Sequence, residues 1–124
     1  MARLDGAIAL ALAENTKPDT SGAADWLETK LAARPKQGLT VVYHSIFLQY
    51  PPEEERARIQ SLIEEAGKSA TPEAPLGWVR FEPEILLTGD PNILEPALDI
   101  TYWPSGQHRI LARSNGHVTK VTAL

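Results

Sequence analysis

Hydrophobic residues near the start of the chain repeat with the spacing of an α-helix. Leu4, Ile8 and Leu12 lie four residues apart, which predicts a helix over residues 3–14 with one apolar face available for burial. Pro18 ends this pattern, because proline lacks a backbone N–H and clashes with the preceding helical turn. The segment is therefore predicted to be a helix followed by a linker.

A second run of helical spacing covers residues 23–33, with Trp26 among its apolar positions. Thr20 or Ser21 is placed to cap the first turn, because a hydroxyl oxygen there accepts from a free backbone N–H. Trp26 is predicted to be a core anchor, since an aromatic side chain on such a stripe buries a large apolar area.

The next stretch, residues 39–44, has no charged residue, and both of its alternating sets are mostly apolar or β-branched. This composition predicts a strand covered on both faces, as in a parallel or mixed α/β sheet. Pro51 and Pro52 then open a helix whose early glutamates suit its positive N-terminal end. Gly67 is predicted to be the C-cap of that helix.

The second half of the chain has the spacing of strands. Residues 76–82 predict a strand that completes a parallel, right-handed strand–helix–strand unit with the first strand. Residues 83–96 hold several prolines and are predicted to be an irregular loop. Residues 97–103 and 108–114 predict a hairpin whose alternation indicates one more solvated face, and residues 116–124 either extend it or stay loose.

These elements predict one α/β domain over residues 1–124, in which residues 1–20 are an N-terminal helix and linker. The sheet is expected to be mixed and mostly four-stranded, with one parallel crossover unit, a C-terminal antiparallel hairpin and about three helices. This arrangement is a Rossmann-like half-sheet.

Composition excludes several classes of function. The formal net charge of −4 provides no basic surface for nucleic acid, so no nucleic-acid partner is expected. No apolar run approaches the roughly 20 residues that cross a bilayer, and the N-terminus lacks a signal-peptide pattern, so no membrane is expected. The chain has no cysteine, which excludes disulfides and thiolate sites. A cytoplasmic protein is expected.

The order helix, strand, helix, strand, strand, strand resembles the second half of a class I S-adenosylmethionine-dependent methyltransferase sheet. Residues 41–56 look like the fourth-strand region of such enzymes, where a strand ends in a polar or aromatic pair before a proline-acidic helix start. The chain also resembles the C-terminal part of a bacterial family, domain of unknown function 2332. The similar segments are Asp25-Trp-Leu-Glu28, Val42-Tyr-His-Ser45 with Tyr50, Pro75-Leu-Gly-Trp78, residues 98–104 and 109–114, and Gly116 with His117.

The resemblance implies S-adenosylmethionine chemistry for longer proteins of this kind, whose first half holds a glycine-rich cofactor loop. None of the eight glycines here forms a Gly-x-Gly pattern after a strand. No cofactor is therefore expected for this chain alone, and S-adenosylmethionine is expected only if a separate N-terminal half is supplied. The chain is then half of a methyltransferase-like domain without independent catalysis. The alternative is a free-standing protein-interaction or small-ligand-binding module.

Ligands of open α/β sheets sit beyond the carboxyl ends of parallel strands. His44 and Ser45 end the first strand and are the candidate catalytic residues, with the histidine as general base and the serine as hydrogen-bond donor. The alternative is a structural role, in which both side chains form hydrogen bonds with backbone groups at the strand end. The candidate ligand-binding residues are Tyr43, His44, Ser45, Tyr50, Glu82 and His117.

The other chemically distinctive residues are assigned structural or solvated roles. Three scattered histidines without an i, i+4 pair predict no metal site. His108 is expected to be solvated beside the hairpin turn, and Trp78 and Trp103 are expected to pack in the core.

The strand over residues 39–44 is also the basis for an expected partner. Without a first half of the sheet, its outer edge is unpaired, and long apolar edges recruit other chains. Self-association as a homodimer, or association with a separate N-terminal half, is expected through that edge or the sheet face that helices leave bare. The first helix covering that face is the alternative.

Overall fold

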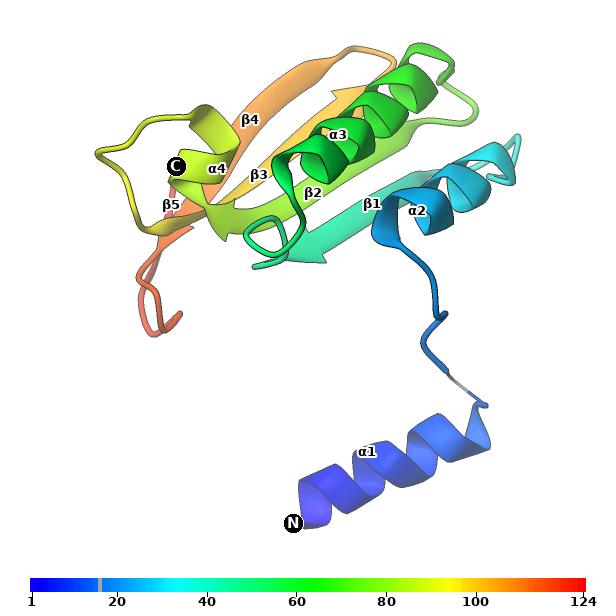
Figure 1. Cartoon of the computed structure of the whole chain (residues 1–124), viewed down its shortest axis with the longest axis vertical. Helices are drawn as coiled ribbons and strands as arrows, with labels where there is room; N and C mark the ends of the chain where they lie inside the picture. The colour runs from blue at the N-terminus through cyan, green and yellow to red at the C-terminus, as the bar shows by residue number, and fades with distance from the viewer. Residues whose placement is uncertain (16) are drawn as a thin grey trace.

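The computed structural model describes residues 1–15 and 17–124, so Thr16, in the predicted linker, lies outside the described residues. Nine elements follow one another along the chain (Figure 1). They are α1 (Ala2–Ala13), α2 (Ala23–Ala32), β1 (Thr40–Ser45), α3 (Glu53–Lys68), β2 (Leu76–Pro83), α4 (Glu84–Thr88), β3 (Pro96–Trp103), β4 (Gln107–Ser114) and β5 (Val121–Ala123).

The strands form one sheet in the order β1-β2-β3-β4-β5. β1 and β2 are parallel, whereas β3, β4 and β5 each pair antiparallel with the strand before. The predicted mixed α/β fold, with one parallel unit and a hairpin, is confirmed. The sheet has a fifth strand because residues 121–123 fold back on β4. Residues 83–96, expected to be an irregular loop, begin with α4.

Helices α2 and α3 pack on one face of the sheet (Figure 1). The apolar stripes of both helices pack against Leu76 and Trp78 of β2. Ile63 of α3 is fully buried in this contact. The buried cluster is Ala24, Leu27, Leu31, Ile59, Ile63, Ala70, Leu76 and Trp78, with Trp103 packed against it. Core roles for Trp78 and Trp103 are thereby confirmed.

Of the helices that the structure describes, none covers the opposite face of the sheet (Figure 1). Val41 and Tyr43 of β1 are 50% and 62% exposed, so the prediction of a strand covered on both faces is wrong. The physical reason is that both long helices of the domain body lie on the same side. In register with Tyr43 lie Val79 and Ile100, which makes this bare face apolar.

The two faces of β3 differ in what covers them. Asp99 and Thr101 pair with Arg80 and Trp78 and lie on the helix-covered face. The apolar alternate set, which includes Ile100, therefore faces away from the helices. The more solvated face of the hairpin is thus the one that carries the apolar residues of β3.

Three expectations for the N-terminal region are wrong. No residue of α1 is buried, and α1 stands apart from the domain body, so its apolar stripe is unused within the described chain (Figure 1). Trp26 is 41% exposed, and its indole Nε1 donates to Asp19 at 2.6 Å rather than packing in the core. The N-cap of α2 is Gly22 without a side-chain bond, so neither Thr20 nor Ser21 caps it.

Gly67 lies inside α3 and is not the predicted C-cap, since the helix continues to Lys68 and Ser69 is the C-cap. The reason for glycine at this position is close packing. The indole ring of Trp103 occupies the place where a Cβ on residue 67 would be. The absence of a side chain thereby lets α3 approach β3.

Candidate functional site

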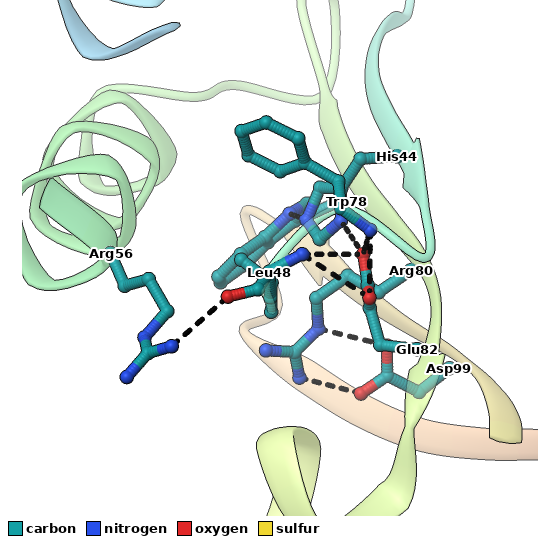
Figure 2. A network of polar contacts seen from close by, with 8 residues as sticks. His44, Leu48, Arg56, Trp78, Arg80, Glu82 and Asp99 are labelled. Carbon is teal, nitrogen blue, oxygen red and sulfur yellow. Dashed lines mark hydrogen bonds and ion pairs between the residues drawn. The ribbon is translucent and has the colours of Figure 1, made fainter. Parts of the chain in front are cut away.

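The helix-covered face combines an apolar core with an unusual number of buried charges. Glu82, Glu84 and Asp99 are buried to 1% exposure or less. Burying a carboxylate costs several kcal/mol unless hydrogen bonds and a counter-charge compensate for lost hydration. Each of the three has such partners, and Figure 2 shows Glu82 and Asp99 with theirs.

Glu82, at the end of β2, holds the loop that follows β1. Its two oxygens accept from the backbone N–H of Phe47 at 2.9 and 3.0 Å and from that of Leu48 at 3.3 Å. One oxygen also lies 2.6 Å from Nδ1 of His44. The carboxylate thus connects the end of β1 to the loop that leads into α3, and Figure 2 shows these hydrogen bonds converging on Glu82.

His44 uses both of its ring nitrogens in this network. The indole of Trp78 only donates, and its Nε1–H reaches Nε2 of His44 at 3.0 Å. Nε2 therefore accepts, and Nδ1 is the nitrogen placed to donate to Glu82. Neither nitrogen is free for proton transfer to a ligand in this arrangement. The geometry favours positioning of the loop, and the general-base role stays a prediction.

Arg80 and Asp99 form a second, adjoining network. Nε and Nη2 of Arg80 donate to the two oxygens of Asp99 at 2.9 and 2.5 Å, a bidentate pair. The guanidinium carbon of Arg80 lies 4.3 Å from the centre of the Trp78 ring, which joins this pair to the first network. His108, expected to be solvated, is half-exposed and places Nε2 2.7 Å from Asp99.

A third pair lies at the start of α4. Arg113 donates from Nε and Nη2 to the buried carboxylate of Glu84 at 2.6 and 2.7 Å. These hydrogen bonds from Arg113 lower the pKa of Glu84 below its ordinary value of 4.5, against the opposing effect of burial. The pair fastens β4 to the segment between β2 and β3.

The lowered pKa of Glu84 gives a testable pH dependence. A carboxyl with a lower pKa in the folded state stabilises the fold at higher pH, and this contribution is lost as pH falls through the folded pKa. We therefore expect the difference in unfolding free energy between wild type and Glu84→Gln to shrink below pH 4.5. Urea denaturation across pH measures it, with the exposed Glu73→Gln as control. A difference that stays constant down to acid-unfolding pH would contradict the pairing.

A cavity of about 300 Å³ opens between α3 and α4 above these networks. Its lining combines the guanidinium groups of Arg56 and Arg80 with apolar side chains. The lining residues are Leu48, Glu53, Arg56, Ala57, Ile59, Gln60, Trp78, Arg80 and Leu86. The cavity therefore adjoins the carboxyl ends of the parallel strands β1 and β2, where ligands of α/β sheets bind.

The structure brings two of the predicted site residues together, His44 and Glu82. Ser45 and Tyr43 alternate with His44 along β1, and both are exposed. Tyr50 is exposed in the loop before α3. His117 is exposed in the turn between β4 and β5, at the edge of the sheet opposite to β1. Their roles stay predictions.

Arg80 and Asp99 were missed by the sequence reasoning, although a signal was present. Each is a charged residue within an otherwise strand-like stretch, and the two stand in direct register across β2 and β3. Alternation alone does not tell which face of β3 the helices cover, so it did not place Asp99 beneath them.

Within residues 1–15 and 17–124, no three side chains of histidine, aspartate or glutamate gather as a metal site would require. In the same part of the chain, every helix is too short or too polar to traverse a bilayer.

Comparison with known proteins gives one match. A family model described as "Uncharacterized protein conserved in bacteria (DUF2332)" matches residues 1–122. No curated protein and no solved structure matches the chain.

Proposed function

The chain belongs to the bacterial family DUF2332, and on that premise we propose that it is the C-terminal half of a methyltransferase-like α/β domain, without catalysis of its own. Its role in this proposal is to supply half of a sheet. A helix-bearing N-terminal half covers the bare face and the outer edge of β1.

The observation that carries this proposal is the apolar face that α2 and α3 leave uncovered. Parallel α/β sheets carry helices on both faces, and their strands are apolar on both sides for that reason. Here the second layer is missing, yet the side chains that it would bury are present. Val79, Phe81, Leu98 and Ile100 occupy the centre of that face in adjacent register positions.

The energetics favour association over exposure of this face. Full burial of an aliphatic or aromatic side chain contributes roughly 1.5–3 kcal/mol. The four central side chains are already partly covered by their neighbours, so each gains less than that. A contiguous apolar patch of several such residues is nevertheless typical of an interaction surface.

We expect the isolated chain to self-associate through this face, because no helical layer covers it. Light scattering coupled to size exclusion should give a mass above 13.6 kDa that rises with protein concentration. Ile100→Glu places a charge at the centre of the face and should return the mass to that of the monomer. Leu94→Glu, at a 72% exposed residue outside the sheet, is the matched control and should change nothing.

A single 13.6 kDa species of the wild type at every concentration would contradict the proposal. Equal effects of Ile100→Glu and Leu94→Glu would contradict the choice of surface.

The proposed lack of independent catalysis is tested by measuring whether the isolated chain binds the cofactor. Titration of the isolated chain with S-adenosylmethionine in a calorimeter should give no binding heat. Stoichiometric binding would overturn the proposal that residues 1–124 alone lack the cofactor site.

A further inference from the structure

We propose that the cavity between α3 and α4 binds a small monocarboxylate, held by Arg56 and Arg80. This inference concerns the helix-covered side of the sheet. It does not depend on the proposed pairing of the bare face, because the two surfaces lie on opposite sides.

The first argument is the fixed orientation of Arg80. Its side chain is 11% exposed, and the bidentate pair with Asp99 and the stacking on Trp78 hold the guanidinium in one place. Among the described residues Nη1 makes no hydrogen bond, while Arg80 lines the cavity. A guanidinium with its remaining donors already oriented loses little conformational freedom when it binds a carboxylate.

The second argument is the charge of Arg56. Nη1 of Arg56 donates to the backbone carbonyl of Leu48 at 3.1 Å (Figure 2), and both residues line the cavity. No carboxylate of the described residues lies within ion-pair distance of Arg56, whereas Arg80 is neutralised by Asp99. Arg56 therefore has guanidinium donors that no contacting carboxylate occupies, and these donors favour an anionic acceptor although Glu53 also lines the cavity.

The third argument concerns the size and polarity of the ligand. A volume of about 300 Å³ is at the lower end of ligand pockets, which fits a molecule of a few to about ten heavy atoms. Leu48, Ile59 and Leu86 provide apolar walls for a compact hydrocarbon body.

Glu53 decides between classes of anion. Glu53 also lines the cavity, and its negative charge disfavours a second negative charge on the ligand. A carboxylate with one charge is therefore repelled less than a doubly charged phosphate, and it can accept from Nη1 of Arg80, which Asp99 does not occupy. A monocarboxylate with an aliphatic body combines the features that this lining accommodates.

The test is a titration of the ¹⁵N-labelled full chain with 3-methylbutanoate, followed by NMR. We expect saturable shifts of the Trp78 indole N–H and the Arg80 Nε–H signals, with a Kd on the order of 1 mM for so small a ligand. The uncharged isostere 3-methylbutanamide should give no saturable shift. Inorganic phosphate should bind at least about tenfold more weakly, a difference that corresponds to about 1.4 kcal/mol.

Variants locate the site. Arg56→Gln should weaken binding about tenfold, and Ala57→Leu should abolish it by filling the cavity while remaining a good helix former. Arg58→Gln is the matched control on the same helix, because Arg58 pairs with Asp25 and Glu28 away from the cavity, and binding should be unchanged. Arg80 is not replaced, since its loss would leave buried Asp99 without its guanidinium partner.

Three results would overturn the proposal. The first is an absence of saturable shifts with 3-methylbutanoate in the folded wild type. The second is equal binding of the amide or tighter binding of phosphate. The third is binding that Arg56→Gln and Ala57→Leu leave unchanged while their spectra remain folded.

Discussion

Glu82→Met should lower the free energy of unfolding by about 3–5 kcal/mol, which is a large part of the roughly 5–15 kcal/mol that stabilises a typical domain. Methionine matches the length of glutamate but accepts almost no hydrogen bond. The N–H groups of Phe47 and Leu48 and Nδ1 of His44 would lose their acceptor. Each donor left unpaired in a buried site costs roughly 1–3 kcal/mol.

Two further measurements separate this network from a simple loss of packing. Glu82→Gln keeps one oxygen acceptor and should cost about half as much as Glu82→Met in urea denaturation. Hydrogen exchange of the Phe47 and Leu48 amides should accelerate in Glu82→Met well beyond the change in global stability. Unchanged exchange at both amides, or equal stability of the two variants, would show that Glu82 does not hold this loop.

The pairing of His44 with Glu82 shows how far sequence reasoning reaches in this fold. Both residues end strands predicted to be parallel neighbours, and the carboxyl ends of such strands meet at one edge of a sheet. The structure brings the side chains to 2.6 Å. The additional contact with Trp78 could not be predicted from spacing, because it depends on rotamers within the packed core.

The sidedness of the sheet was the main feature that sequence could not provide. Period-two alternation separates two faces but does not say which one the helices cover. The alternation of β3 therefore did not indicate that Asp99 lies beneath the helices with Arg80. Tyr43 was assigned to a covered face, although α2 and α3 pack on the other side.

Both observations describe one physical arrangement. Buried charged side chains lie beside the apolar core on the helix-covered side, and apolar side chains lie on the bare face. A sheet with one covered face would normally have polar side chains on the bare one. The bare face therefore suits a further layer of protein, and the buried charges suit a polar ligand. The two proposed functions follow from the two sides of the same sheet.

The close approach of α3 to Trp103 gives a second large effect. Gly67→Ala should lower the free energy of unfolding by about 2 kcal/mol, although alanine is favoured over glycine by about 1 kcal/mol within a helix. The added Cβ would overlap the indole ring of Trp103, so the ring or the helix must move. Thermal and urea denaturation monitored by circular dichroism measure the change.

A matched glycine and a double mutant establish the cause of that loss. Gly6 lies in exposed α1 with nothing near its missing Cβ, so Gly6→Ala should raise helix content and leave the unfolding of the domain unchanged. In a Trp103→Leu background, Gly67→Ala should cost at least about 1 kcal/mol less than in wild type, because the two positions are in contact. Equal costs in both backgrounds would mean that overlap with the indole does not set the requirement for glycine. The same comparison would then locate the constraint in the backbone of α3 rather than in its packing against β3.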